Sequence, residues 1–228
     1  MKYIFFDLDN TICESRQNTT PAMYGALHNL QKNPNYKIFI IGGLDYKTAS
    51  SQCDLENILY MSQNGNEQVF SDPKLEFGKQ ILLNIITQEE KENIFNHVTL
   101  LVNYLEITDM FDKVEDRGAQ ISISFVGHHA QINDKRKFDP DRTKRIELLK
   151  KFPFSNAFVA GTTCIDYILH TKGDNISKYI KENNIKAVDC LYIGDALEPG
   201  ANDYSVVGII PTHSVKNPTE TLEFIKQL

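Results

Sequence analysis

The sequence predicts an α/β fold in which a core domain with a parallel sheet carries an inserted α+β module. Short apolar runs without polar alternation occur near both ends of the chain, which is typical of strands buried on both faces. A helical segment separates the first two of these runs. The middle of the chain instead alternates long helical patterns with strands, one of which has a polar face.

The N-terminal segment predicts a strand, a helix and a second strand. Residues 3–6 are aromatic and β-branched, and residues 37–41 form a similar run that ends at two glycines. Between them, Thr20 and Pro21 suit the N-cap and first position of a helix, which the turn-forming residues 33–35 would stop. Strand, helix and strand within about forty residues indicate a right-handed βαβ unit.

The C-terminal segment predicts the rest of the core. Residues 189–193 form another buried strand ending in Gly194, residues 206–210 predict a further strand, and residues 219–227 a closing helix. The core domain is therefore expected at residues 1–79 and 171–228.

The inserted module is expected at residues 80–170. A helix is predicted at residues 87–105, opened by the capping box of Thr87 and Glu90. A half-exposed antiparallel strand follows at 119–126, then a basic helix at 142–152 and an apolar, β-prone stretch at 157–169, interrupted at Gly161.

Composition excludes several classes of protein. The 228 residues are 41% hydrophobic and 24% charged, as in a globular protein that buries a core. A formal charge of −6 and the absence of Trp give a nucleic-acid partner little support. No apolar run reaches the roughly 20 residues that span a bilayer, so no membrane partner is expected. Asp7 and Asp9 interrupt the N-terminal apolar stretch, which excludes a signal peptide and predicts a cytoplasmic protein. The four dispersed cysteines indicate buried thiols.

Acidic residues follow three of the predicted core strands. Ligands of open α/β sheets bind at the carboxyl ends of the strands. Five carboxyl groups are expected at that edge: Asp7, Asp9, Asp45, Asp195 and Asp203. Crowded carboxylates repel one another, and a hard divalent cation is the usual remedy.

These motifs resemble those of the haloacid dehalogenase-like (HAD) phosphotransferases. The resemblance rests on Asp-x-Asp-x-Thr at residues 7–11 and on Gly-Asp-x-x-x-x-Gly-x-Asn-Asp at residues 194–203. The Gly-Gly-x-Asp at 42–45, Asn64-Gly65 and the Pro-Gly-x-Asn-Asp ending at Asp203 are similar to motifs of the eukaryotic-type phosphomannomutases. The resemblance implies a Rossmann-like core and a cap domain of the type IIB kind in the inserted module.

The resemblance also implies roles for residues of the core. Asp7 would be the nucleophile that forms an aspartyl-phosphate, and Asp9 the general acid and base. Mg²⁺ would be held by the Asp7 and Asp195 carboxylates and the main-chain oxygen of Asp9, with Asp203 as a ligand or its supporting partner. Thr11 is a candidate substrate-binding residue that would cap the turn or support the Asp9 position, with a plain turn residue as the alternative.

The core departs from the family at two positions. Leu44 stands where phosphomannomutases have a serine, so that a phosphate near Gly43 and Leu44 would meet backbone N–H groups alone. Ile176 stands at the family's lysine position. Lys172 or Lys178 is therefore expected to supply the cation from a neighbouring position, with Lys172 taken as the catalytic candidate.

The cap departs further. Arg117 matches the family's arginine at the entry to the cap strand, but His128 stands where the family has another arginine. The pair His128-His129 is expected in an exposed turn. Lys135 or Arg136 is the candidate replacement cation for phosphate binding, although such a basic run more often forms a solvated face.

The sequence therefore predicts a Mg²⁺-dependent HAD-type phosphatase that acts on a small phosphorylated metabolite, with a sugar phosphate as the favoured class. The alternative is a phosphomannomutase that interconverts mannose 1-phosphate and mannose 6-phosphate. A rival from another class is a binding protein that has lost catalysis. The sequence leaves open the question of a homodimer formed through the cap.

Overall fold

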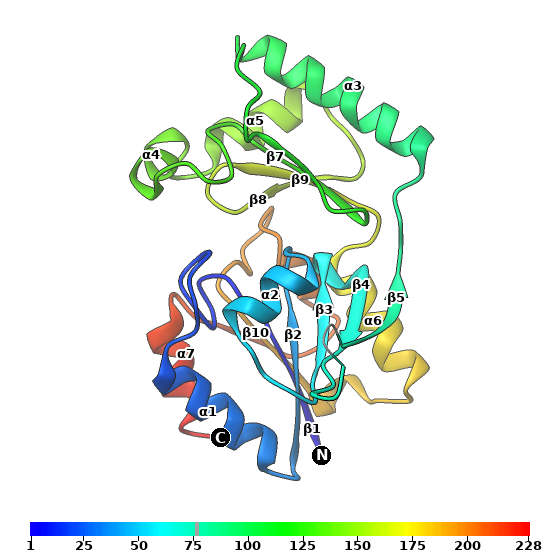
Figure 1. The fold of residues 1–228 in the computed structure, drawn as a ribbon, viewed down its shortest axis with the longest axis vertical. Coiled ribbons are helices and arrows are strands. Elements are labelled where there is room, and N and C mark those ends of the chain that lie inside the picture. The colour runs from blue at the N-terminus through cyan, green and yellow to red at the C-terminus, as the bar shows by residue number, and fades with distance from the viewer. Residues whose placement is uncertain (76–77) are drawn as a thin grey trace. The chain divides into compact units, whose positions relative to one another are not determined.

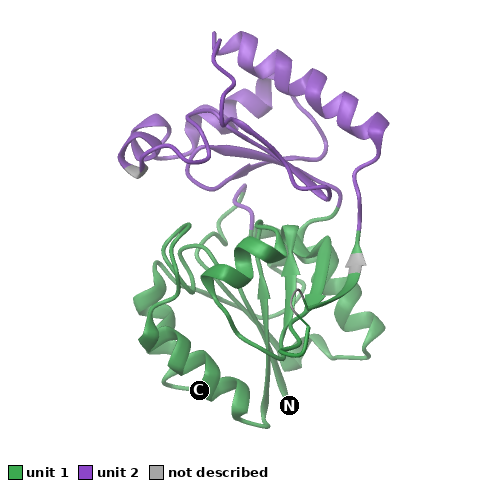
Figure 2. Cartoon of the chain, viewed as in Figure 1, with its two compact units in different colours: residues 1–83, 170–199, 203–228 green, residues 84–169, 200–202 purple. Residues whose placement is uncertain are grey.

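The computed structural model describes residues 1–75 and 78–228, and the chain divides into two compact units (Figure 1, Figure 2). The first unit comprises residues 1–83, 170–199 and 203–228, and the second comprises residues 84–169 and 200–202. The first unit is thus built from both ends of the chain, and the second mainly from its middle.

The first unit contains a mostly parallel sheet with the strand order β11-β10-β1-β2-β3-β4-β5. Neighbouring strands from β11 to β3 pair in parallel, whereas β3-β4 and β4-β5 pair antiparallel. The strands are β1 (Lys2–Phe6), β2 (Tyr36–Ile41), β3 (Leu59–Ser62), β4 (Glu67–Phe70), β5 (Lys79–Leu83), β10 (Cys190–Gly194) and β11 (Thr212–Ser214). The buried strands predicted at 3–6, 37–41 and 189–193 are confirmed as β1, β2 and β10.

The register of the central strands aligns their carboxyl ends. Phe6 of β1 lies opposite Ile40 of β2 and Ile193 of β10. The residues that follow these three strands therefore begin at the same edge of the sheet, where an open α/β sheet binds its ligands.

Side-chain caps mark the starts of helices in the first unit, and the cap predicted at Thr20 is confirmed. The Thr20 side chain accepts the Met23 N–H, and Pro21 occupies the first turn of α1. Asn217 caps α7 in the same way. The α-helices of this unit are α1 (Pro21–Lys32), α2 (Tyr46–Gln52), α6 (Lys172–Glu182) and α7 (Pro218–Ile225). Over the described residues, no helix is long and apolar enough to cross a membrane.

Apolar side chains fill both faces of this sheet. Alternate residues of β2 point to opposite faces, so Ile40 packs in one core cluster with Leu27 of α1, and Phe39 packs in the other with Ile176 of α6. The four cysteines are free thiols; Cys13, Cys53 and Cys190 are buried and Cys164 is half-buried.

The strand predicted at residues 206–210 is wrong. Residues Tyr204–Val206 form a short 3₁₀ turn, and the edge strand β11 begins only at Thr212. Gly208 has a φ of +87°, which breaks the extended backbone between two buried side chains, Val206 and Ile210. The run is apolar because those two side chains pack in the core.

The second unit is an antiparallel sheet with helices on one face. Its strand order is β6-β7-β9-β8. The capping box predicted at Thr87 and Glu90 is present at the start of α3. The elements are α3 (Gln88–Tyr104), β6 (Val114–Asp116), β7 (Gln120–Ser124), α4 (Ile132–Phe138), α5 (Thr143–Lys151), β8 (Ala157–Ala160) and β9 (Cys164–Ile168).

The strand predicted as half-exposed, β7, is buried on both faces. Ile121 and Ile123 pack in the core of this unit, and Gln120, Ser122 and Ser124 are also buried. The polar side chains are satisfied by neighbours: Gln120 Nε2 and Ser122 Oγ donate to Asp166 at 2.8 and 2.5 Å. Alternation in sequence identifies a polar face, but hydrogen bonding lets that face be buried.

Two helical glycines offer a matched test of packing. A Cβ at Gly173 in α6 would lie 1.9 Å from the Ser205 carbonyl oxygen, whereas a Cβ at Gly25 in α1 would meet nothing within 4 Å. We expect Gly173→Ala to lower the free energy of unfolding by about 1–3 kcal/mol through overpacking. Gly25→Ala should raise it by about 0.5–1 kcal/mol. Urea unfolding of both variants measures the difference, and equal stability of the two would contradict the close approach at Gly173.

Candidate active site

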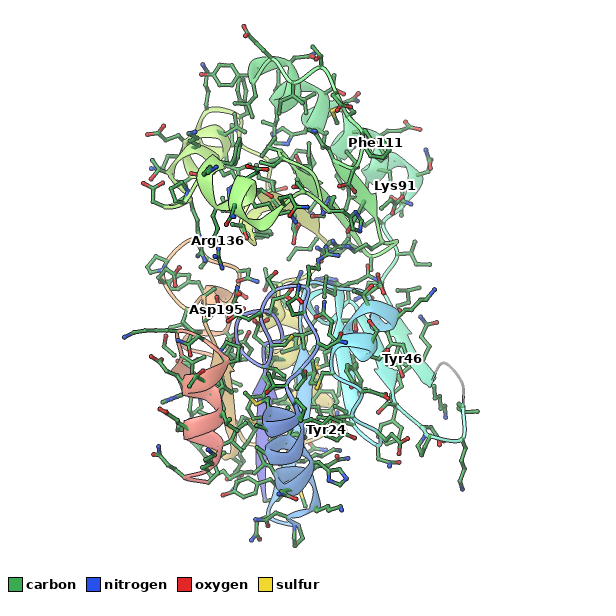
Figure 3. All side chains as sticks on the ribbon, turned by 60° about the vertical axis from the view of Figure 1, so that its left-hand side comes forward. Tyr24, Tyr46, Lys91, Phe111, Arg136 and Asp195 are labelled. Carbon is green, nitrogen blue, oxygen red and sulfur yellow. The ribbon has the colours of Figure 1, made fainter. Side chains whose placement is uncertain are left out.

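Three carboxyl groups meet at the carboxyl ends of β1 and β10. Asp7 follows β1, Asp195 follows β10 (Figure 3), and Asp203 lies at the end of the loop that follows β10. One oxygen from each lies within 4.8 Å of those of the other two. Asp7 and Asp203 are buried and Asp195 is half-buried. The register of the sheet therefore gathers three of the predicted site residues.

A buried lysine joins this cluster. Lys172 is the first residue of α6, and its Nζ donates to Asp7 Oδ1 at 2.5 Å and to Asp203 Oδ1 at 2.7 Å. Lys178, the alternative candidate on the same helix, is exposed. Lys172 precedes Ile176 by four residues, so the two share a helix face and the lysine lies one turn closer to the N-terminus. That turn brings its ammonium to Asp7.

Tyr192 is a member of the cluster that the sequence analysis missed. It lies on β10, and its hydroxyl accepts the Lys172 ammonium at 3.2 Å. Its ring is fully buried. The sequence signal for Tyr192 was its place two residues before Gly194, on the face of β10 opposite that of Ile193. An aromatic residue at such a place in a buried strand is normally interpreted as a core residue.

Burial and charge shift the pKa values of this cluster. Burial raises the pKa of Asp7 well above its usual value; the Asp203 and Asp195 carboxyls add to this rise, and the Lys172 ammonium opposes it. Burial works to lower the pKa of Lys172, but Asp203 and Asp7 outweigh it and keep that pKa above its ordinary value. Lys172 therefore stays charged, and a further cation beside Asp7 would lower the pKa of its carboxyl.

The donor set fits a magnesium ion. Mg²⁺ takes oxygen ligands, and Asp7, Asp195 and Asp203 present carboxylate oxygens to one another within 4.8 Å. Lys172 donates to Oδ1 of both Asp7 and Asp203, and their Oδ2 atoms accept the Thr11 hydroxyl at 3.3 Å and the Ala196 N–H at 3.4 Å. Each carboxylate oxygen has a further lone pair that could bind a metal ion.

The loop after β1 carries two further predicted residues. The Thr11 hydroxyl donates to Asp7 Oδ2 at 3.3 Å, so Thr11 contacts Asp7 itself. Asp9 is half-buried, and its Oδ1 accepts the Arg16 N–H at 3.0 Å. Thr11 thus lies beside the carboxylate predicted to be the nucleophile, and the Asp9 side chain is held by its own loop.

The segment after β2 differs in part from expectation. Leu44 is buried in the core cluster against α1, so its side chain points away from any ligand, and only its backbone and that of the half-buried Gly43 remain candidates for phosphate binding. Asp45, expected among the gathered carboxylates, caps α2 by accepting the Thr48 N–H at 2.8 Å. Helix capping accounts for an aspartate at this position.

Gly194 is required by the close approach of the cluster. A Cβ at this position would lie 2.4 Å from Asp203 Oδ2 and 2.6 Å from Tyr192 Cε1. The glycine at the end of β10 therefore makes room for the Asp203 carboxylate.

Predicted substrate-binding residues of the second unit are engaged within that unit. Arg117 forms an ion pair with Glu115. Burial works to lower the pKa of Arg117, but the Asp166 and Glu115 carboxylates outweigh it and raise that pKa. Lys135 Nζ donates to the His128 carbonyl at 2.5 Å. The guanidinium of Arg117 is therefore already paired with carboxylates.

The histidine pair is only partly as predicted. His129 is exposed, and its Nδ1 lies 2.6 Å from Asp112 Oδ1. His128 is buried, with Nε2 3.3 Å from the Ser122 carbonyl oxygen and Nδ1 3.6 Å from Glu115. The expected exposed turn thus holds for His129 and is wrong for His128, which packs against the sheet. Arg136, the other candidate cation, is exposed on α4 (Figure 3).

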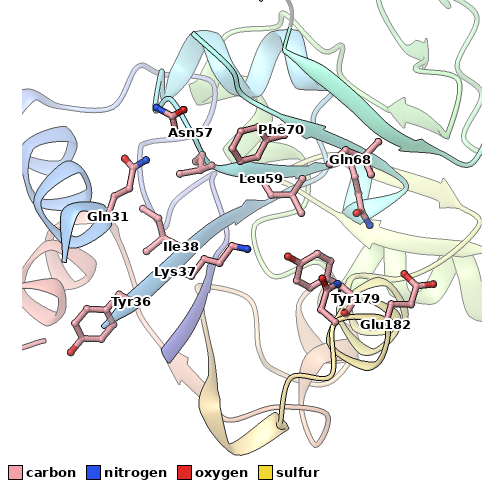
Figure 4. A pocket seen from close by; sticks show the side chains of 13 residues that line it. Gln31, Tyr36, Lys37, Ile38, Asn57, Leu59, Gln68, Phe70, Tyr179 and Glu182 are labelled. Carbon is pink, nitrogen blue, oxygen red and sulfur yellow. Dashed lines mark hydrogen bonds between the residues drawn. The ribbon is translucent and has the colours of Figure 1, made fainter. Parts of the chain in front are cut away.

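A separate pocket of about 580 Å³ lies at the amino ends of β2 and β3 (Figure 4). It is lined by Lys37, Leu59, Phe70 and Tyr179, among others. This end of the parallel strands is opposite to the end that carries Asp7. None of the strand-end motifs lines it, so it is not the candidate active site.

Comparisons with known proteins identify relatives in sequence and neighbours in fold. No protein-family model matches the chain. A phosphomannomutase of Drosophila melanogaster is 24% identical over 99% of this chain and 94% of its own length. Among solved structures, a truncated IMP-nucleotidase of Plasmodium falciparum matches with a TM-score of 0.71 at 14% identity, over 99% of this chain and 69% of that one. A haloacid dehalogenase-like hydrolase of B. subtilis matches with a TM-score of 0.63 at 14% identity, over the full length of both chains. The chain is therefore similar over nearly its whole length to phosphomannomutases and has the fold of haloacid dehalogenase-like hydrolases.

Proposed function

We propose that this protein is a Mg²⁺-dependent phosphatase of a small phosphorylated metabolite, with sugar phosphates as the favoured class. The observation that carries the proposal is the contact of Asp7 with Lys172 and Thr11 at the end of β1, beside Asp195 and Asp203. This arrangement combines a carboxylate nucleophile with a cation placed to stabilise the charge of a phosphoryl group.

The proposed reaction has two steps. An Asp7 carboxylate oxygen attacks phosphorus, the bond from phosphorus to the leaving oxygen breaks, and Asp9 donates a proton to that oxygen. In the second step Asp9 takes a proton from water, whose oxygen attacks the aspartyl-phosphate and releases inorganic phosphate and free Asp7. Lys172 stays charged throughout and balances the negative charge next to Asp7. A Mg²⁺ ion held by Asp7, Asp195, Asp203 and the Asp9 main-chain oxygen would supply positive charge beside the phosphoryl group.

The second unit supports hydrolysis over transfer between two positions of a sugar. The family resemblance assigns the grip on the distal phosphate to cap arginines. Here Arg117 is paired with Glu115 and lies near Asp166, and the expected arginine at 128 is a buried histidine. A second phosphate would have to displace carboxylates from Arg117, whose planar fork binds either anion.

A phosphomannomutase is the second candidate, because the similarity to such enzymes covers nearly the whole chain. A catalytically inactive binding protein is the third, and the contacts of Asp7 with Lys172 and Thr11 oppose it. Release of phosphate from p-nitrophenyl phosphate, measured with Mg²⁺ and again after EDTA, tests enzyme against binding protein. Turnover that EDTA abolishes and Mg²⁺ restores is expected, and no turnover in either arm would contradict the proposal.

Hydrolysis is expected to exceed transfer with mannose 1-phosphate. Losing one charge-assisted contact to the distal phosphate costs about 1.5–3 kcal/mol, or roughly ten- to a hundredfold in binding. The enzyme is supplied with mannose 1-phosphate and a bisphosphate activator, and both products are followed by ³¹P NMR. Free phosphate should form faster than mannose 6-phosphate. The reverse order would assign the enzyme to the mutases.

A further inference from the structure

We propose that Tyr192 is a positioning residue that holds the Lys172 ammonium against Asp7, an inference that rests on the proposed function. The three hydrogens of that ammonium find three acceptors: Asp7 Oδ1 at 2.5 Å, Asp203 Oδ1 at 2.7 Å and the Tyr192 hydroxyl at 3.2 Å. Lys172 and Tyr192 are both fully buried, so the hydrogen bonds of the ammonium are made to these protein groups.

The position of the lysine explains why a third partner matters. Lys172 reaches the cluster from the first turn of α6, with Ile176 one turn later in the apolar core. The lysine side chain is a flexible four-carbon stem. With carboxylates as its sole partners, the ammonium could move towards either carboxylate. Asp7 and Asp203 both attract it, and the Tyr192 hydroxyl on β10 fixes the ammonium at a point that both can reach.

The chemistry of the phenol suits this role. An ordinary phenol has a pKa of about 10 and carries its proton near neutral pH. The Tyr192 hydroxyl accepts from Lys172 with its oxygen at 3.2 Å and brings no charge of its own to the cluster. When the reaction changes the charge on Asp7, a neutral partner does not change with it, so Lys172 keeps its orientation during turnover.

The test is Tyr192→Phe, which removes the hydroxyl and leaves the ring in its apolar surroundings. The matched control is Tyr60→Phe: Tyr60 is an equally buried tyrosine of the same unit whose hydroxyl donates to the Cys53 carbonyl, and the Leu55 N–H donates to it at 3.0 Å. We expect Tyr192→Phe to lower kcat and kcat/KM together by about tenfold, as for loss of one interaction made in the transition state. Tyr60→Phe should lower thermal stability and leave both constants unchanged.

A second readout does not depend on turnover. A buried ammonium exchanges slowly with water, so ¹H–¹⁵N NMR should detect the Lys172 NζH₃⁺ signal, assigned by its absence in Lys172→Met. In Tyr192→Phe this signal should shift and exchange faster with water, and in Tyr60→Phe it should not. An unchanged Lys172 signal, or loss of stability with kcat intact, would overturn the proposal. If the wild-type protein hydrolyses no phosphate ester, the proposed function fails, and the NMR comparison alone decides whether Tyr192 holds Lys172.

Discussion

Asp7→Asn is expected to abolish turnover while the protein stays folded. The amide has nearly the shape of the carboxyl group, but it lacks the nucleophilic oxygen that would form the aspartyl-phosphate. Asp7 also contributes an oxygen to the cluster with Asp195 and Asp203, so the variant should bind Mg²⁺ less tightly. Phosphate release from p-nitrophenyl phosphate measures turnover, and thermal unfolding tests whether the variant stays folded.

Asp45→Asn is the matched control for this prediction. Asp45 also follows a core strand, but its carboxylate caps α2, and asparagine is an equally good N-cap. This variant should keep nearly full activity and stability. If Asp7→Asn retains a tenth of the wild-type rate, the covalent role assigned to Asp7 is wrong.

Lys172→Met is expected to lower kcat by about 10²–10³, as is typical when one preorganised group that stabilises transition-state charge is removed. The change also leaves Asp7 and Asp203 without the ammonium that donates to both. Since breaking a buried ion pair leaves uncompensated charge, stability should fall by about 3–5 kcal/mol. Urea unfolding and steady-state kinetics measure these losses.

The same variant predicts a shift in the pH profile. Lys172 opposes the rise in the pKa of Asp7, so its removal raises that pKa further. Asp7 must be ionised to attack phosphorus, and the pH at which activity appears should therefore move upward. The control is Lys178→Met on the exposed face of α6, which should change neither rate nor profile. Equal losses of kcat in the two variants would show that Lys172 has no specific role in the reaction.

Local sequence signals were sufficient for much of the fold. Apolar runs identified β1, β2 and β10, and the capping residues Thr20 and Thr87 marked the starts of α1 and α3. These signals work because helix caps and buried strands depend on residues close together in the chain. The run at 206–210 was predicted wrongly because a 3₁₀ turn and Gly208 can also bury two apolar side chains.

The sequence by itself determined where the acidic motifs of this protein lie, since each follows a strand whose burial pattern is plain. Only the tertiary structure decided which of the nearby residues meet. Asp45 turned to cap its own helix, Lys172 and not Lys178 reached Asp7, and Tyr192 joined them from β10. The reason is that each outcome depends on the direction of a side chain across a helix turn or a strand face. Asp45 is held by the start of α2 and Tyr192 by the pleat of β10. The direction of Lys172 is set by the packing of α6 against the sheet, which brings together residues 165 positions apart, Asp7 and Lys172.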